Sequence, residues 1–247
     1  MARTVAIIGA LEKEVRHIFA ALSHGSEDVA AGLTIACGEL DGLRVVATTA
    51  GMGTVNVAAA TQHLISVYGA DTVIFSGIAG GLNPALHIGD VVVGRCLRYI
   101  DTDTALIAES APALEEFAST PHLVEMAVQA LRAHGYVAVD DADGTTSPDT
   151  PRYLCGTIAT GDRFITGDAL RQAVIDATQA DCAEMEGAAV THIAAKNGVD
   201  CLVLRAISDN CDEAYDAFCE REFDLDEYAR SASELTLDIV HRIAAHA

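Results

Sequence analysis

The stretch "CAEMEGAAVTHIAAKNGVDCLVLRAISD", which runs from Cys182 to Asp209, decides how the rest of the chain is interpreted. Its spacing predicts a helix over Glu184–Asn197, closed by Gly198, and then an apolar strand over Cys201–Asp209. Small residues after the two glutamates would let such a helix lie close to a sheet. A helix followed directly by a buried strand is typical of an α/β fold, with helices packed on the faces of a sheet.

The same alternation of elements extends along the chain in both directions. The Asp41-Gly42 pair is a hairpin signal, which indicates that the sheet is mixed. No repeat, linker or shift in composition divides the chain, so we expect one domain over residues 1–247. Strands are predicted at Val5–Ile8, Leu33–Cys37, Leu43–Thr48, Thr72–Phe75, Gly89–Gly94 and Leu154–Thr160, helices at Glu12–Leu22, Val55–Tyr68, Pro121–His134 and Asp224–Ala244, and a polar loop at Asp140–Arg152.

Composition excludes several classes of partner. The formal net charge of −21 would repel nucleic acid and anionic membranes, so a small molecule or a second copy of the chain is the expected partner. No run of eighteen apolar residues predicts a membrane span, and the first residues favour a β-strand over a signal peptide. The seven cysteines form no C-x-x-C pair, which favours free thiols in a cytoplasmic protein and predicts neither a metal site nor a cofactor.

Polar and glycine-rich signals follow the predicted strands. These include Glu14, the turn expected at Gly77-x-x-Gly80-Gly81, Phe164 and the pair Ser208-Asp209. Ligands of open α/β sheets bind beyond the carboxyl ends of the strands, so these residues are candidates for one site. The glycine segments match neither the dinucleotide fingerprint nor a Walker loop. Backbone N–H groups of Ile78 and Gly80 could instead face ligand hydroxyls or a water molecule.

Glu184 and Glu186 admit two interpretations. A carboxylate in the first turn of a helix is stabilised by the helix dipole, and this alone could explain each of them. Alternatively, the small residues that follow hold the helix against the sheet, and the two carboxylates are fixed beside a pocket. The first interpretation predicts that Glu186→Gln alters activity little, whereas the second predicts a loss of ligand binding.

Taken in order, eight segments resemble the nucleoside phosphorylase/nucleosidase superfamily, and within it the nucleosidases that act on 5′-methylthioadenosine and S-adenosylhomocysteine. "EMEGAA" and "RAISD", about twenty residues apart, form the strongest joint signal. The resemblance implies a three-layer α/β sandwich around a central mixed, twisted sheet. The segments are "IIGALEKEV", "AGMG", "SGIAGGL", "GDVVV", "RYIDTD", "TGDRFI", "EMEGAAV" and "RAISD".

The resemblance also implies roles in cleaving an N-glycosidic bond, which passes through an oxocarbenium-like sugar. Asp209 matches the acid that protonates the departing adenine, and Ser208 would orient it. Glu14 matches the carboxylate that activates the attacking water. Glu186 matches the residue that binds the ribose hydroxyls, with Glu184 supporting it.

Three further positions correspond to substrate contacts in that family. Met185 would pack under the ribose, Phe164 would stack on the purine, and the backbone of Ile165 would bind the purine edge. The implied partner is a small nucleoside, and the implied assembly is a homodimer.

A phosphorylase is the main alternative within the superfamily. Phosphorylases of this type carry an arginine two residues before the glycine of the central strand and a hydroxyl residue after it. Here Phe75 and Ile78 occupy these positions, and neither Arg95, Arg98 nor Arg205 lies at the motif. Phosphate bound without charged donors would be held weakly, so water is the expected acceptor.

The segment Thr104–Phe117 departs from the nucleosidases, which have an aromatic, glycine-rich loop there. Thr104 and Ile107 stand where larger residues are common, so the pocket for the 5′ group could be more open. A futalosine-type nucleosidase and a hydrolase of adenosine therefore remain alternatives. So does a nucleoside-binding protein without catalysis, although Glu14, Glu186 and Asp209 are all present.

Overall fold

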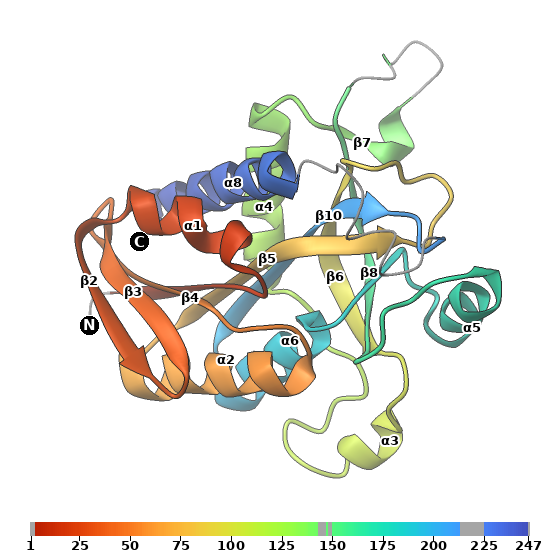
Figure 1. Ribbon diagram of the computed structural model, residues 1–247, viewed down its shortest axis with the longest axis horizontal. Coiled ribbons are helices and arrows are strands. Elements are labelled where there is room, and N and C mark those ends of the chain that lie inside the picture. The colour runs from red at the N-terminus through yellow and green to blue at the C-terminus, as the bar shows by residue number, and fades with distance from the viewer. Residues whose placement is uncertain (1–2, 143–146, 148–149, 213–224, 247) are drawn as a thin grey trace.

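A computed structural model describes residues 3–142, 147, 150–212 and 225–246, without the side chains of Lys13 and residues 225–229. One twisted sheet of ten strands runs through this part of the chain (Figure 1). Its strands are β1 (Thr4–Gly9), β2 (Ser23–Ala30), β3 (Leu33–Leu40), β4 (Leu43–Thr49), β5 (Thr72–Gly81), β6 (Val91–Tyr99), β7 (Val137–Ala138), β8 (Arg152–Thr160), β9 (Cys182–Glu184) and β10 (Asp200–Asp209).

Helices cover both faces of this sheet. They are α1 (Glu12–Ala21), α2 (Thr54–Tyr68), α3 (Thr104–Ile107), α4 (Pro121–Ala133), α5 (Asp168–Thr178), α6 (Gly187–Asn197) and α8 (Leu225–Ala245), with a short 3-10 turn at Val139–Asp141. Helices α1, α4 and α8 lie above the sheet in Figure 1, and α2 and α6 lie below it. None of the helices in the described ranges is long and apolar enough to cross a membrane.

The sheet is mixed, and one half of it closes on itself. Strand β1 lies parallel to β4 and β5, and β5 lies parallel to β10. Strand β10 also pairs antiparallel with β6, and the pairing continues through β8 and β9 back to β5. The hairpin of β3 and β4, with β2 outside it, extends the other half. The closed half brings the ends of β5, β8, β9 and β10 together.

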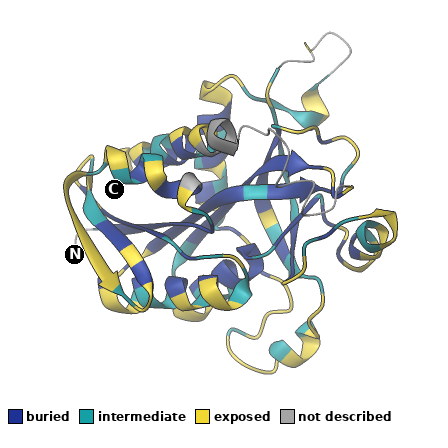
Figure 2. Ribbon diagram, in the orientation of Figure 1, coloured by how far each residue is buried: buried dark blue, intermediate teal, exposed yellow. Residues whose placement is uncertain are grey.

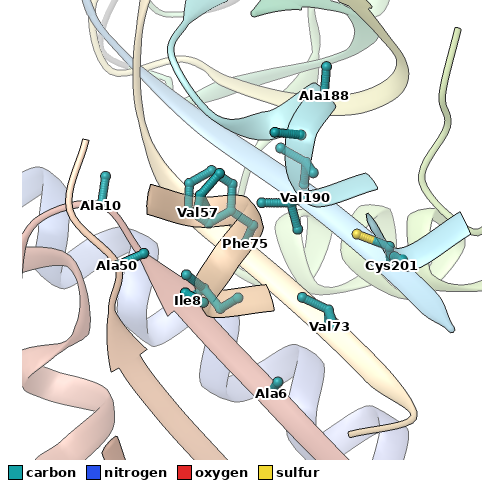
Figure 3. Close-up of a cluster of buried hydrophobic side chains, with 14 of the residues drawn as sticks. Ala6, Ile8, Ala10, Ala50, Val57, Val73, Phe75, Ala188, Val190 and Cys201 are labelled. Carbon is teal, nitrogen blue, oxygen red and sulfur yellow. The ribbon is translucent and has the colours of Figure 1, made fainter. Parts of the chain in front are cut away.

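Two hydrophobic clusters fill the spaces between the sheet and the helices, because alternate side chains of the buried strands point to opposite faces. Val73 and Phe75 of β5 belong to the cluster under α2 and α6, whereas Ile74 belongs to the cluster under α1, α4 and α8. Figure 3 shows Val57 of α2 and Val190 of α6 gathered around Phe75. Figure 2 shows the central strands buried and the outer helix surfaces exposed. The predicted α/β fold, three layers around a central mixed sheet, is confirmed.

Most predicted elements are present with shifted ends, and several were missed. Strand β2 has the sequence "SHGSEDVA" and is exposed on both faces, so no apolar alternation marks it. Helix α5 and the short elements α3, β7 and β9 were also missed. Part of the polar loop predicted at Asp140–Arg152 lies outside the described residues. Cys219 and Asp224, where the last helix was predicted to begin, also lie outside them.

Two predictions near the site were wrong in their local structure. The glycine segment 76–81 is not a turn, because β5 continues through it and pairs there with β10 and β9. Helix α6 begins at Gly187, so Glu184 is the last residue of β9 and Glu186 precedes the helix as its N-cap. Pairing with β8 and β5 extends this segment as strand up to Glu184.

Candidate functional site

A cavity of about 450 Å³ lies where the ends of β5, β8, β9 and β10 meet the start of α1. All ten residues named as site candidates from the sequence line it, from Glu14 of α1 to Asp209 of β10. The structure thus brings together positions that are up to 195 residues apart in the chain. Residues that the sequence interpretation did not name as candidates also line it, and they include Leu11, Met52, Arg163, Arg205 and Cys211.

The two glutamates of the "EMEG" segment have different surroundings. The Glu184 carboxylate accepts hydrogen bonds from the N–H groups of Glu186 and Gly187 and from the hydroxyl of Thr160. It also forms an ion pair with Arg205. Its oxygens are therefore saturated by the protein. Glu184 fixes the junction between β9 and α6, whereas Glu186 is left to face the cavity.

Glu186 has fewer partners of its own. One oxygen accepts the Gly53 N–H at 2.8 Å, and the other lies 3.8 Å from Nη2 of Arg205. Burial and the nearby negative charge of Glu184 raise the pKa of Glu186 to about 7, against the lowering effect of Arg205. A carboxylate that is buried and incompletely bonded can accept hydrogen bonds from a ligand.

Arg205 is the main residue that the sequence interpretation missed. Its side chain is 1% exposed, and its guanidinium lies 4.0 Å from the ring centre of Phe75. Besides the Glu184 ion pair, its Nη1 donates to the Leu204 carbonyl at 3.2 Å. The signal that could have found it is a single cation inside the apolar strand "CLVLRAISD", because a buried charge requires a buried partner.

Glu14 is held at the base of the cavity by backbone donors. Its Oε2 accepts the N–H of Leu11 at 2.8 Å, and its Oε1 accepts that of Ile78 at 3.3 Å. Burial raises the pKa of Glu14, although these bonds and Arg205 act in the opposite direction. A buried carboxylate whose pKa is raised takes up a proton more readily near neutral pH.

Asp209 lies at the end of β10, where a bulge between Ile207 and Asp209 shifts the register against β5. Its Oδ2 accepts the Ser208 hydroxyl at 2.8 Å, and its Oδ1 accepts the Cys211 N–H at 2.8 Å. Both bonds fix the direction of the carboxyl group. Asp209 is buried and lines the cavity, so it can meet a ligand without competition from bulk water.

The strand glycines of β5 make room for these charged side chains. A Cβ at Gly77 would lie 2.7 Å from Oε1 of Glu14 and 2.9 Å from Nη1 of Arg205. A Cβ at Gly80 would lie 2.8 Å from Oδ1 of Asp209. Glycine inside a strand marks such close approach, which explains a segment that resembled a turn in the sequence.

Phe164 and Ile165 form the wall that follows β8. The Phe164 side chain is half-buried at the cavity, and Ile165 is buried in a small cluster with Leu82 and Ala183. Met185 is half-buried and lines the cavity between the two glutamates. An aromatic wall opposite carboxylates suits a ligand with a flat apolar part and a hydroxyl-rich part.

No residue of the segment Thr104–Phe117 lines this cavity within one chain. The cavity is therefore not closed by the segment in which the sequence departs from the nucleosidases. Groups of three or more His, Cys, Asp or Glu side chains that could hold a metal ion do not occur among the residues that the structure describes. A second, smaller cavity of about 170 Å³ lies beside α8 and contains none of the ten candidates.

Comparisons with known proteins show the family to which the chain belongs. The phosphorylase superfamily matches residues 4–244. The 5′-methylthioadenosine/S-adenosylhomocysteine nucleosidase of Shewanella sp. (strain MR-7) is 35% identical over 212 residues, which are 83% of this chain and 84% of that protein. The nucleosidase of the same name from Neisseria meningitidis, solved in complex with methylthio-immucillin-A, has a TM-score of 0.83 and 29% identity, covering 97% of this chain and 99% of that one.

The futalosine hydrolase of Helicobacter pylori strain 26695 has the same fold. Its native structure gives a TM-score of 0.82 at 24% identity and covers 98% of this chain and 99% of that chain. At this level of identity the likeness extends to the fold alone.

Proposed function

This chain belongs to the phosphorylase superfamily, and we propose that it hydrolyses the N-glycosidic bond of 5′-substituted adenosines such as 5′-methylthioadenosine, S-adenosylhomocysteine and 5′-deoxyadenosine. The products are adenine and the 5′-substituted ribose. One observation carries this proposal: carboxyl groups for an acid and a base approach the same strand, β5, at Gly80 and Gly77. Both side chains also line the same cavity, together with Glu186 and Phe164.

In this mechanism Asp209 donates a proton to the adenine ring as the glycosidic bond breaks. Without that proton the base would leave as an anion, which is a poor leaving group. Ser208 and the Cys211 N–H support the proposal because they fix the direction of the carboxyl group. Phe164 stacks on the adenine, and the backbone of Ile165 binds its edge.

Glu14 takes the proton of the attacking water on the opposite side of the sugar. The pKa of Glu14, raised by burial, suits a general base that works near neutral pH. The backbone N–H groups that hold its oxygens keep it in place while the water is consumed. Ile78, whose N–H donates to Glu14, and Gly80 line the cavity with it.

Glu186 binds the ribose hydroxyls, and Met185 packs under the ring. Two carboxylate oxygens match the two hydroxyls of a vicinal diol. Their negative charge also stabilises the positive charge that develops on the sugar, which is larger in the transition state than in the substrate. Glu184 acts only through Arg205 and the start of α6, because its oxygens are already bonded.

Water, rather than phosphate, is the acceptor in this proposal. Arg205 is the buried cation of the cavity, and Glu184, the Leu204 carbonyl and the Phe75 ring already occupy it. Phosphate placed near Glu14 and Glu186 would meet like charges, and the other arginine of the cavity lining, Arg163, is exposed to solvent. Arg98 is bonded to Glu116 and does not line the cavity. No metal or cofactor takes part in the proposed reaction.

We further propose that the protein is a cytoplasmic homodimer. The exposed side of α2 carries no charge in a chain with a net charge of −21, and Val55 and Val67 on it are 78% and 64% exposed. Leu106 of α3 is 63% exposed, and Figure 1 shows α3 on the same side of the sheet. A partner that covers this side could bring its own residues 104–117 to the open 5′ end of the cavity. Sedimentation of the wild type and of Val55→Glu tests the dimer.

A panel of nucleosides tests the proposed substrate class. Methylthioadenosine, S-adenosylhomocysteine, 5′-deoxyadenosine, adenosine, aminodeoxyfutalosine and inosine should be supplied separately, and free base should be measured. We expect adenine from the first three. A clear preference for aminodeoxyfutalosine would favour the futalosine-type alternative, which the absence of Thr104–Phe117 from the cavity wall keeps open. Binding without any release of base would indicate a nucleoside-binding protein.

A further inference from the structure

Asp162 connects two walls of the cavity that are far apart in the sequence. It lies in the segment between β8 and α5, two residues before Phe164. Its Oδ1 accepts the Thr54 N–H and its Oδ2 accepts the Thr54 hydroxyl, both at 2.7 Å. Both carboxylate oxygens thus accept hydrogen bonds from Thr54, the first residue of α2.

The preceding residue, the N-cap Gly53, is bound to Glu186, which is assigned to the ribose. The Gly53 N–H donates to Oε1 of Glu186 at 2.8 Å. Consecutive N–H groups of Gly53 and Thr54 therefore bind two different carboxylates: Glu186, which lines the cavity, and Asp162, whose segment carries Phe164. A Cβ at Gly53 would lie 3.1 Å from Oδ1 of Asp162, and its φ of +95° also disfavours a side chain.

Capping of α2 explains only part of this arrangement. The N-cap residue is Gly53, which has no side chain to cap the helix, and a carboxylate at this end is favoured by the helix dipole. A cap could come from any nearby residue, however. The Asp162 cap comes from the segment that carries Phe164, and the turn before α2 carries Met52, which lines the same cavity.

We propose that Asp162 is a positioning residue of the proposed nucleosidase. It does not line the cavity itself. By fixing Thr54 it holds the aromatic wall at Phe164 in register with the turn whose Gly53 N–H orients Glu186. The purine and ribose sites are thereby kept at one separation before the substrate binds. Preorganisation of this kind lowers the cost of binding and leaves the proton transfers unchanged.

The test compares Asp162→Ala, Thr54→Val and Asp162→Asn with the wild type, using 5′-methylthioadenosine as substrate. The inference rests on the proposed function, and the wild-type reaction checks that function separately through its release of adenine. Asp162→Ala should raise KM about tenfold or more and change kcat far less, because misplaced binding groups weaken substrate binding. Thr54→Val removes only one of the two bonds and should raise KM roughly threefold.

Asp162→Asn should restore a KM close to that of the wild type. The amide oxygen can still accept the Thr54 N–H, and the amide nitrogen can donate to the Thr54 hydroxyl. Asp168→Ala is the matched control, because Asp168 is an exposed carboxylate in the first turn of α5 and lies outside the cavity. It should leave KM unchanged.

A role in stability alone would give a different pattern. The melting temperatures of Asp162→Ala and Thr54→Val would then fall while KM and kcat, measured well below those temperatures, stayed at wild-type values. That pattern would overturn the inference. If Asp162→Ala does not fold, Thr54→Val carries the test, and an unchanged KM for it would be equally decisive.

Discussion

Arg205 allows several carboxylates to share one small cavity. It pairs with Glu184 and lies near Glu186 and Glu14, and all four side chains are buried. A buried cation or carboxylate without a partner would be strongly destabilising, so the set is stable only as a unit. Arg205 cannot neutralise three ionised carboxylates, so whenever Glu14 and Glu186 are ionised the set favours a ligand that becomes positive during its reaction.

The acid can be separated from the ribose site by one substitution. Asp209→Asn removes the proton donor but keeps the shape of the side chain. Turnover should fall by about 10² to 10⁴, the usual contribution of a placed proton donor, while adenine still binds. Steady-state assays and calorimetry would measure the two effects. Normal turnover in Asp209→Asn would show that another group is the acid.

Glu186→Gln should give a different result from the acid variant. The amide retains one acceptor but loses the charge, so the bonds to the ribose hydroxyls weaken. Ligands that contain the ribose should bind less tightly and turnover should fall, whereas free adenine should bind nearly as in the wild type. Unchanged affinity for ribosyl ligands would refute the assignment of Glu186 to the ribose.

The stability of the same variant, relative to the wild type, should depend on pH. The pKa of Glu186 rises from 4.5 to about 7 on folding, mainly because of burial. Between these values the folded state binds more protons than the unfolded state, so the free energy of unfolding decreases as pH rises through this range. The amide of the variant does not titrate there. Glu186→Gln should therefore gain stability relative to the wild type between pH 5 and pH 8, by up to about 3 kcal/mol.

Urea denaturation at the two pH values would measure this gain. Glu125→Gln on the exposed side of α4 is the control, because it removes a negative charge that stays in water in both states. If Glu186→Gln changed the free energy of unfolding equally at both pH values, burial would not raise the pKa of Glu186.

At the scale of elements, β5 matters most for the site. It continues through "SGIAGG" and pairs with β1, β9 and β10. Glycines stand where charged side chains approach it, at Gly77 for Glu14 and Arg205 and at Gly80 for Asp209. Residues of β5 therefore line the cavity, and the acid Asp209 and the base Glu14 approach the strand at Gly80 and Gly77.

Gly77→Ala should disturb the base directly. The new methyl group would lie 2.7 Å from Oε1 of Glu14, so Glu14 or Arg205 must move. Overpacking of this kind typically costs about 1–3 kcal/mol, and turnover should fall by more than tenfold because the base is misplaced. Gly81→Ala is the matched control on the same strand, with its closest contact at 3.3 Å. Equal activity of the two variants would contradict this account of β5.

The elements found from the sequence were those with a clear apolar period. Strands β1, β5 and β10 are buried runs, and α2 ends at Gly69, which adopts the left-handed conformation. Strand β2 could not be found because its polar residues give no alternation. Helix α5 did carry a signal, since Leu170, Val174 and Ile175 are spaced for one face, and that signal was overlooked.

The site was predictable where it follows strand ends. Ligand-binding residues of α/β sheets gather near the carboxyl ends of the strands, and all ten candidates line one cavity there. Arg205 and Asp162 were missed for different reasons. Arg205 lies inside a strand, and its partner Glu184 is 21 residues away. Asp162 acts through Thr54, which is 108 residues away, and no local pattern connects them.

At the scale of the whole molecule, charge determines which reaction suits the cavity. The chain has 36 acidic and 15 basic residues. The cavity is lined by four carboxyl side chains, Glu14, Glu184, Glu186 and Asp209, and by two arginines, Arg163 and Arg205. Such a field opposes the entry of a phosphate anion and stabilises a cationic sugar. The local bonds of Arg205 and the overall charge thus both favour water as the acceptor.

The sugar product formed from 5′-methylthioadenosine tests the central claim most directly. The reaction should be run with EDTA present, with and without inorganic phosphate, and the sugar identified by mass. The account predicts free 5′-methylthioribose and adenine at the same rate in both buffers. A rate that depends on phosphate, with 5′-methylthioribose 1-phosphate as the product, or a complete loss of activity in EDTA that a divalent ion restores, would contradict it.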